Sequence, residues 1–386
     1  MSRVGVVGVG HSRFGRRTDV NLGELAFESI KQAVDDAGVD RGDIGNVVVG
    51  SAGGWYEESL PAVVVDEYAG LSGAGTMRVE AACASGSAAV KAAYNSIVSG
   101  ETDVALAVGV EKMTEVDTPT SVELIGRAGS YMWEFENYGM TFPAYYALYA
   151  VAHMDRFGTT QEDLSRVSVK AHHYGAMNPL AQFQKEITLE QALNSPVVSW
   201  PLRLYDSCPL SDGSAAVVLA SEEAARKLTD TPVWIRGVGY SSDTANLSRR
   251  DGYVGLRAAV RAATNAYAMA KVTPEGIDVA TAHDCFTIAE LMAYEDLGFC
   301  RKGEGAKMIR EGETEIGGRI PVNLDGGLKA KGHPIGATGV SMVVEITKQL
   351  RGEAGRHQAP VKHGVGLVHN VGGTGHYAYV TILSRN

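Results

Sequence analysis

The sequence predicts an α/β fold built from two duplicated halves, each of which begins with a βαβ unit. In the first half, a strand, a helix and a second strand are expected over residues 4–9, 22–37 and 44–49. The same order returns near residue 233, with a β-rich run WIRGVG, a helix over 254–269 and a strand that starts near residue 277. Apolar residues recur at helical spacing in the helices and run almost continuously in the strands. The repeat predicts two similar sheets related by a pseudo-twofold axis.

Later elements of the two halves also correspond. A helix over 83–98 and strands over 104–110 and 215–220 are matched by a helix over 336–350, a strand over 364–368 and a closing strand in GGTGHYAYVTIL. A segment rich in aromatic residues and methionine interrupts the first half. We expect an N-terminal half over 1–225 with an insertion at about 114–209, and a C-terminal half over 226–386. The insertion could cover a substrate tunnel, build a subunit interface or be a packed helical excursion.

Composition and charge narrow the class of protein. The chain has 386 residues, 45% of them hydrophobic and 21% charged, and a formal net charge of -10. Without a Lys/Arg block, an acidic chain is not expected to bind nucleic acid or an anionic membrane nonspecifically. No uninterrupted apolar run is long enough for a transmembrane helix, and the N-terminus lacks a signal-type segment. Four widely spaced cysteines favour a reducing, cytoplasmic compartment.

Cys83 is a candidate nucleophile. It lies in EAACASGSAAV, at the first turn of the predicted helix over 83–98. A helix N-terminus carries unpaired N–H groups and partial positive charge, which lower the pKa of a thiol and increase its thiolate fraction. A small buried cysteine fits the local sequence equally well.

His333 is the candidate base. It lies in GGLKAKGHPIGATG, residues 326–339, which leads into the second half's counterpart of the Cys83 helix. The pseudo-twofold axis would bring the two helix N-termini together and set a base beside a nucleophile. His333 could also donate to a developing oxyanion, or it could be an ordinary loop residue.

A second thiol follows the strand that starts near residue 277, in the motif His283-Asp284-Cys285-Phe286. The ends of strands are site-forming positions in α/β sheets. Cys285 could protonate or deprotonate a substrate α-carbon, and His283 could hold a water that binds a thioester oxygen. A buried cysteine beside a helix-capping Asp284 is the structural alternative. No metal is expected, because a metal site would need further ligands at suitable spacing.

The segment HNVGGTG, residues 369–375, is predicted to be a turn after the strand over 364–368. Its glycines leave backbone N–H groups free to face an oxygen, so the amides of Cys83 and Gly372 could form an oxyanion hole. A tight β-turn is the simpler alternative. Cys208 and Cys300 lie outside these motifs and are expected to be structural. Glu111, His172, His173 and the Ser211-Asp212-Gly213 segment could line a pocket, but solvated or turn roles are expected for them.

With these motifs the chain resembles the thiolase superfamily over essentially its full length. Cys83-Ala84-Ser85 resembles the nucleophile motif and Gly332-His333-Pro334 the activating-histidine motif, while the motif at 283–286 is similar to that of sterol-carrier-protein-type and archaeal-type thiolases. The segments VEAACASGS, GVEKMT and AQFQKEIT resemble archaeal-type acetyl-CoA C-acetyltransferases. The resemblance implies the thiolase fold.

One position departs from the family pattern. Asn370 stands two residues before Gly372, where many thiolases carry a second catalytic cysteine. In the branch with the 283–286 motif, the resemblance assigns the acid/base thiol to Cys285. The implied reaction is the reversible condensation of two acetyl-CoA molecules to acetoacetyl-CoA through an acylated Cys83. In it, His333 and a water held by His283 would stabilise the enolate oxygen. Coenzyme A thioesters are the substrates, and no cofactor is implied.

The resemblance also implies partners. It predicts a homo-oligomer, dimer or tetramer, and a possible complex with 3-hydroxy-3-methylglutaryl-CoA synthase through a small zinc-ribbon and OB-fold protein, feeding the mevalonate route to isoprenoids. The alternatives are a degradative 3-ketoacyl-CoA thiolase, a lipid-transfer-type retro-aldolase acting on a longer or steroid side-chain acyl-CoA, and an inactive scaffold. The joint presence of Cys83, His333 and Cys285 favours acyl-enzyme chemistry.

Overall fold

A computed structural model describes residues 3–386 of the chain. The strands of the first half are β1 (Val4–His11), β2 (Asn46–Gly50), β3 (Gly75–Val79), β4 (Val104–Lys112) and β7 (Asp212–Ser221). Its helices outside the insertion are α1 (Leu22–Ala37), α2 (Pro61–Ala69), α3 (Ser85–Val98) and α8 (Glu222–Leu228). The strands of the second half are β8 (Val233–Ser242), β9 (Val279–Ala282), β10 (Val365–Gly372) and β11 (Tyr377–Ser384). Its helices are α9 (Arg257–Ala270), α10 (Thr287–Asp296), α11 (Gly305–Arg310) and α12 (Ile335–Arg351).

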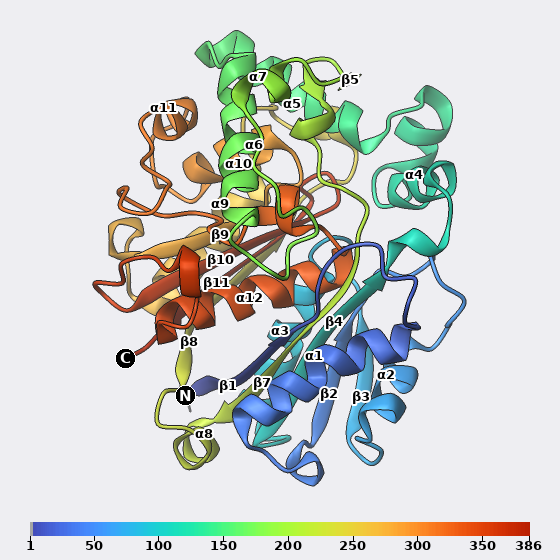
Figure 1. Cartoon of the computed structure of the whole chain (residues 1–386), viewed down its shortest axis with the longest axis vertical. Helices are drawn as coiled ribbons and strands as arrows, with labels where there is room; N and C mark the ends of the chain where they lie inside the picture. The colour runs from blue at the N-terminus through green and yellow to red at the C-terminus, as the bar shows by residue number, and fades with distance from the viewer. Residues whose placement is uncertain (1–2) are drawn as a thin grey trace.

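The predicted α/β class and duplicated plan are confirmed, with one correction. The strands form one nine-stranded sheet in the order β3-β2-β4-β7-β1-β8-β11-β10-β9 instead of two separate sheets (Figure 1). The junction is a short antiparallel pairing of β1 with β8, in which Gly5 faces Trp234 and Val6 faces Val233. Two residue pairs are enough to join the sheets of the two halves. A short pairing between distant segments has no sequence pattern by which it could be predicted.

The pairing pattern repeats across this junction. β1 and β7 are antiparallel, as are β7 and β4, whereas β4 and β2 are parallel. In the second half β8 and β11, β11 and β10, and β10 and β9 pair in the same three senses. β3 adds a parallel edge to β2, and its counterpart is a single parallel bridge between Ala280 and Val322. The halves are therefore related by a pseudo-twofold axis. The boundary between residues 225 and 226 stays a prediction.

Helices α3 and α12 form the central layer between the two parts of the sheet, while α1 and α9 pack on its outer faces (Figure 1). Glycines permit the close approach of the two central helices. A Cβ atom on Gly86 would lie 2.7 Å from the carbonyl oxygen of Gly336, and a Cβ atom on Gly109 would lie closer still to that oxygen. These separations are shorter than a van der Waals contact, so the first turn of α12 meets α3 at Gly86 and β4 at Gly109 only because the side chains are absent.

Local hydrogen bonds and backbone conformation set the two ends of α1. At the start of α1, the side chain of Asn21 accepts from the N–H of Glu24 at 2.9 Å, and the Glu24 carboxylate accepts from the N–H of Asn21 at 2.8 Å. This capping box satisfies backbone donors that a helix N-terminus leaves free. The helix ends at Gly38, whose φ of 60° is left-handed.

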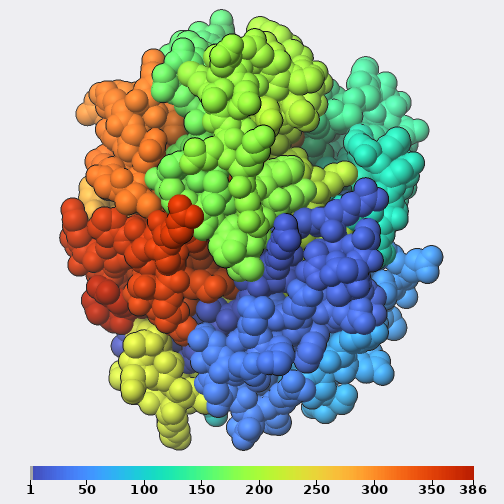
Figure 2. All heavy atoms as spheres, in the orientation of Figure 1, coloured from blue at the N-terminus to red at the C-terminus, as the bar shows by residue number. Residues whose placement is uncertain are grey.

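The chain between β4 and β7 forms the segment that has no counterpart between β10 and β11. It contains α4 (Thr118–Gly126), α5 (Phe142–Phe157), α6 (Gln161–Gly175), α7 (Leu189–Leu193) and a hairpin of β5 (Val197–Ser199) and β6 (Leu202–Arg203). Much of this green segment lies over the junction of the blue and orange halves (Figure 2). It inserts the fully buried rings of Tyr145, Tyr146 and Tyr149 between itself and the second half. Among residues 3–386, no helix is long and apolar enough to cross a membrane.

Two predicted turns are strand instead. β10 continues through Gly372, which pairs with Tyr377, so the turn covers only the connection 373–376. β7 begins at Asp212, whose carboxylate accepts from the N–H groups of Arg17 and Thr114 at 2.8 Å each. Glycine and aspartate are common in turns, so the local sequence predicts turns at these positions. Pairing with distant strands makes them strand ends instead.

Candidate active site

Cys83 lies in the turn before α3, two residues ahead of the first helical residue, and Ala82 beside it adopts a left-handed φ of 50°. The thiol is buried against Trp55, Met113 and Ile335. Burial raises the pKa of the Cys83 thiol to about 12, although the N–H groups of Gly373 and of Cys83 itself act in the opposite direction. The expectation that the helix N-terminus would lower this pKa is therefore wrong for the resting protein: desolvation outweighs the backbone dipoles, and the thiol needs a base.

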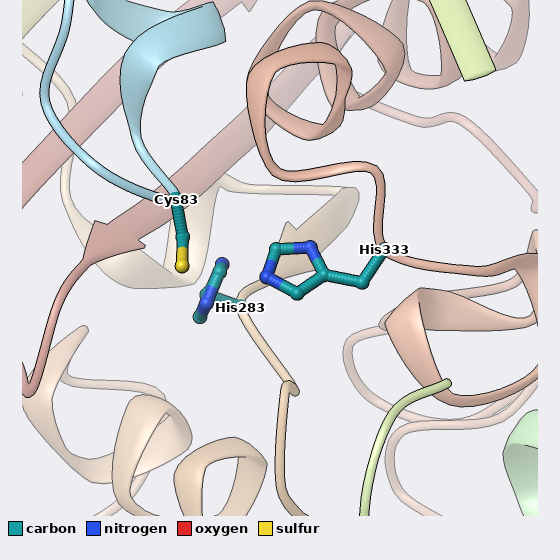
Figure 3. A group of neighbouring side chains, drawn as sticks. All are labelled: Cys83, His283 and His333. Carbon is teal, nitrogen blue, oxygen red and sulfur yellow. The ribbon is translucent and has the colours of Figure 1, made fainter. Parts of the chain in front are cut away.

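His333 supplies a candidate base at the start of α12. One side-chain ligand atom from each of Cys83, His283 and His333 lies within 4.8 Å of the others. Figure 3 shows the His333 ring directed toward the other two side chains, which come from separate segments. The predicted meeting of the two loops across the pseudo-twofold axis is thus present in the structure.

The hydrogen bonds of His333 fix its neutral tautomer. Its Nδ1 lies 2.7 Å from the hydroxyl oxygen of Thr338, and that hydroxyl donates to the carbonyl of Pro334 at 2.9 Å. The hydroxyl proton is thereby used, so Nδ1–H must donate to Thr338. Nε2 is left with a lone pair and has no hydrogen-bond partner among the described residues. Burial, with a smaller effect of Lys331, lowers the pKa of His333 to about 3, so the ring is neutral and its Nε2 lone pair is free.

His283 has the opposite tautomer. Asn370 Nδ2 donates to the carbonyl of Cys83 at 3.0 Å and lies 3.1 Å from His283 Nδ1. A carbonyl oxygen can only accept, so the atom beside it is the amide nitrogen, and His283 Nδ1 accepts from it. His283 Nε2 therefore carries the proton. Burial lowers the pKa of His283 well below its usual value, and the neighbouring His333 and His369 lower it further.

Cys285 lies directly after His283 and Asp284, in the loop that follows β9, and is buried. Burial raises the pKa of its thiol well above the ordinary value, and Cys208 and Cys83 raise it further. Asp284 does not cap α10; its carboxylate accepts from the N–H of Leu328 at 2.8 Å and so holds the segment that leads to His333.

The prediction that Cys208 lies apart from the site motifs is wrong, because the structure places it beside Cys285. Its backbone N–H donates to the carbonyl of Cys285 at 2.9 Å. Burial raises the pKa of its thiol to about 12. The side chain lines a cavity of about 450 Å³ that also has Lys329 in its wall. The other lining residues are His172, Gln182, Phe183, Gln184, Lys185, Ile187, Leu204, Tyr205, Ser207 and Pro209. Cys208, whose N–H contacts Cys285, thus connects the wall of this cavity with the Cys285 motif.

Glu111 and His172 are buried instead of solvated. The Glu111 carboxylate accepts from the N–H groups of Ala52 at 2.9 Å and Gly53 at 3.0 Å. Burial raises its pKa to about 6. His172 lies in the wall of the cavity beside Cys208, whereas His173 is half-buried and its ring contacts Glu186.

The Ser211-Asp212-Gly213 segment supports the site. The Ser211 hydroxyl oxygen accepts from the N–H of His333 at 3.0 Å and donates to Gln182. Sequence reasoning missed this role, as it missed Thr338 and Tyr146, because each acts through contacts that no local motif marks. Cys300 lies partly buried at the edge of the core.

Comparison with known proteins agrees with this geometry. Residues 4–223 match the family model described as thiolase, N-terminal domain, and residues 239–385 match the thiolase C-terminal domain-like model. The chain is 45% identical to the acetyl-CoA acetyltransferase of Methanothermobacter thermautotrophicus, with 100% of both chains covered. It is 34% identical to sterol carrier protein 2 of Bos taurus, covering 96% of this chain and 70% of that protein.

A solved structure of the Ltp2-ChsH2(DUF35) aldolase has a TM-score of 0.87 and 27% identity to this chain, covering 100% of this chain and 98% of the other. Both family models and the full-length relatives thus lead to one assignment. The chain belongs to the thiolase family.

Proposed function

We propose that the chain is an acetyl-CoA acetyltransferase that condenses two acetyl-CoA molecules, or cleaves acetoacetyl-CoA with coenzyme A, through an acyl-enzyme at Cys83. The observation that carries the proposal is the convergence of the Cys83 thiol with His283 and His333, whose tautomers are opposite. The full-length likeness to archaeal acetyl-CoA acetyltransferases, at 45% and 42% identity, supports the choice of substrate.

Acylation begins at the free lone pair of His333. Its Nε2 takes the proton from Cys83 Sγ, and the sulfur attacks the thioester carbonyl, so the high pKa of the resting thiol is compatible with nucleophilic attack. Collapse of the tetrahedral intermediate expels the coenzyme A thiolate. Cys285 gives its proton to this leaving sulfur, which leaves Cys285 as a thiolate and His333 as an imidazolium.

Condensation then uses the charges left by acylation. The Cys285 thiolate removes an α-proton from the second acetyl-CoA, and the proton on His283 Nε2 donates, directly or through a water, to the enolate oxygen. The enolate carbon attacks the acyl carbon and displaces Cys83 as a thiolate. His333 returns its proton to Cys83, so the three groups end in their starting states.

The oxyanion of the tetrahedral intermediates requires backbone donors. The amides of Cys83 and Gly372 are the pair expected from sequence. The N–H groups of Gly373 and of Cys83 both act to lower the pKa of the Cys83 thiol, which supports Gly373 as an alternative partner of Cys83. Gly372 remains in β10, where its lack of a side chain has another use: a Cβ atom there would collide with the carbonyl oxygen of Ala81. We assign the donor role to Cys83 and Gly373.

The proposal also covers the need for a cofactor, the path of the substrate and the partners of the protein. Because a thioester acidifies its own α-carbon, the reaction as written uses no metal or other cofactor. The cavity beside Cys208 would admit the pantetheine arm of the thioester.

We further propose that the protein is a cytoplasmic homo-oligomer, a dimer or a tetramer. It would form a complex with 3-hydroxy-3-methylglutaryl-CoA synthase and a small zinc-ribbon/OB-fold protein, and so supply the mevalonate route.

The test is an assay of acetoacetyl-CoA cleavage with coenzyme A, followed by loss of the enolate absorbance. We expect turnover in the wild-type protein and none in Cys83→Ala. The degradative thiolase and retro-aldolase alternatives have support from the likeness to sterol carrier protein 2 and to the Ltp2-ChsH2(DUF35) aldolase. Cleavage of a longer 3-ketoacyl-CoA or a β-hydroxyacyl-CoA, with no turnover of acetoacetyl-CoA, would favour these alternatives. Absence of all three activities would favour a scaffold.

A further inference from the structure

Tyr146 is a residue of the inserted segment that reaches the candidate active site. It lies on α5 and is fully buried. Its ring stacks on Phe286, the residue after Cys285, with ring centroids 4.6 Å apart and an angle of 23° between the planes. On its other side it meets Tyr149 edge to face, with centroids 5.5 Å apart. These contacts hold the ring in one orientation.

The hydroxyl of Tyr146 donates to the carbonyl oxygen of Gly373 at 3.5 Å. It is also near enough to the Cys285 thiol to act on it, and its effect lowers the pKa of that thiol. Tyr146 also shares the wall of a small internal void with His283 and His369. The hydroxyl therefore lies among the groups to which the proposed reaction assigns proton transfer.

We propose that Tyr146 is a further catalytic residue, whose hydroxyl donates a hydrogen bond to Cys285 Sγ and stabilises the thiolate that removes the substrate α-proton. This inference rests on the proposed function. The hydroxyl keeps its own proton throughout: the proton of Cys285 leaves with the coenzyme A sulfur, and Cys285 recovers one from the α-carbon. Tyr146 supplies a hydrogen bond at both stages and is neither oxidised nor ionised.

The surroundings explain why a donor is needed. A thiolate on Cys285 would lie among buried apolar side chains. Cys208 and Cys83 make its formation harder, and Lys329 favours it only in part, so its pKa stays well above the ordinary value. A buried anion is tolerated when a neighbouring group hydrogen-bonds to it. Tyr146 can fill this role as a constant donor because burial, together with the nearby Cys285, raises the pKa of its phenol well above the ordinary value.

The same helix also positions the connection 373–376. The hydroxyl of Tyr149 donates to the carbonyl of Thr374 at 2.7 Å, and Arg250 donates to that carbonyl at 2.6 Å. α5 is thereby tied to the segment that carries the Gly373 N–H. One helix of the insertion thus supports both the acid/base thiol and the proposed oxyanion donor.

Tyr146→Phe tests the proposal, because it removes the hydroxyl and keeps the ring stacked on Phe286. The first measurement is the pH dependence of Cys285 alkylation by iodoacetamide, followed by peptide mass in a Cys83→Ala background. We expect the apparent pKa of Cys285 to rise by about one unit, as for loss of a hydrogen bond to a charged group. Tyr145→Phe is the matched control, because the Tyr145 hydroxyl donates to Glu134 at 2.9 Å, and its profile should stay unchanged.

The second measurement uses Tyr146→Phe with Cys83 intact. Because the Cys285 thiolate forms during acylation and is consumed in condensation, we expect Tyr146→Phe to slow both steps and to lower kcat for condensation by about 10- to 100-fold. Cys83 should still reach one acetyl group per chain. An unchanged alkylation profile, or an unchanged kcat in a wild-type enzyme that turns over, would overturn the role of Tyr146. Failure of the wild-type protein to become acetylated on Cys83 would instead overturn the proposed function, and the alkylation profile would still decide whether the hydroxyl acts on Cys285.

Discussion

Asn370 Nδ2 lies between the carbonyl oxygen of Cys83, at 3.0 Å, and Nδ1 of His283, at 3.1 Å. One amide nitrogen thus holds the nucleophile's turn against the loop after β9 and fixes which nitrogen of His283 carries a proton. Asn370 occupies the position where many thiolases are expected to carry a cysteine, and in this chain it is a positioning residue.

Asn370→Ala should lower kcat for acetoacetyl-CoA cleavage by about 10- to 100-fold, because His283 loses the donor that fixes its tautomer. Asn370→Asp should be more damaging, since a carboxylate would repel the carbonyl oxygen of Cys83 and would favour a proton on His283 Nδ1, which reverses the tautomer. Steady-state kinetics of the two variants, with unfolding midpoints to check the fold, measure this. Equal activity of Asn370→Asp and wild type would refute the tautomer assignment.

Thr338→Val should slow acetylation of Cys83 by about tenfold, because the His333 ring loses the acceptor that orients its Nδ1–H. Single-turnover acetylation followed by intact mass gives the rate. Thr347→Val is the matched control on the same helix, since the Thr347 hydroxyl is buried without a hydrogen-bond partner among the described residues. A similar loss of rate in both variants would indicate a packing effect instead of an orienting one.

Treatment with EDTA, followed by removal of the chelator, should leave turnover unchanged. Cys83, His283 and His333 form a donor set that zinc can use, but the proposed cycle requires all three groups for proton transfer and nucleophilic attack. Added Zn²⁺ should therefore inhibit, and EDTA should reverse the inhibition. Metal content measured together with activity makes the comparison, and loss of turnover on chelation, restored by Zn²⁺, would contradict the cycle.

His11 should make folding sensitive to acid. Burial, with Lys331 nearby, lowers its pKa to about 3 from an ordinary value of 6.5. Below pH 6.5 the unfolded chain binds a proton that the folded chain does not, so the stability due to neutral His11 is lost progressively as pH falls toward 3. The loss is about 1.4 kcal/mol per pH unit well below the pKa of the unfolded chain.

The measurement is the free energy of unfolding in urea at about pH 7.5 and about pH 5, on either side of the ordinary histidine pKa, for wild type and His11→Leu. The difference between the two pH values should be smaller in His11→Leu, even though loss of the contact with Ser12 lowers its stability at both. An identical pH dependence in the two proteins would exclude the titration of His11 as a cause.

Two kinds of feature could be predicted from the sequence: helices with a clear spacing of apolar residues, and the correspondence between the two halves. The spacing of apolar residues places the helix over 22–37 at the observed bounds of α1, and the correspondence of the halves predicts that the loops of Cys83 and His333 meet. Strand ends near glycines were less predictable. The Ser211 segment and residues 369–372 have turn-like composition, but pairing with distant strands makes residues 212–213 and 369–372 part of β7 and β10.

The electrostatics of the site could not be predicted from the sequence. The position of Cys83 before α3 indicates a lowered pKa, yet burial raises it, because desolvation depends on side chains from the whole fold. Cys208 and Tyr146 are placed beside Cys285 by segments outside its motif. Such residues become recognisable only when long-range contacts are known.

The most direct test of the central claim is the mass of the intact protein after exposure to acetyl-CoA, in wild type, Cys83→Ala and Cys285→Ala. The proposed cycle predicts one acetyl group on wild type and on Cys285→Ala, mapped to the peptide that contains Cys83, and none on Cys83→Ala. It also predicts that Cys285→Ala fails to form acetoacetyl-CoA. Acetylation of Cys83→Ala at another thiol, or normal condensation by Cys285→Ala, would contradict the account.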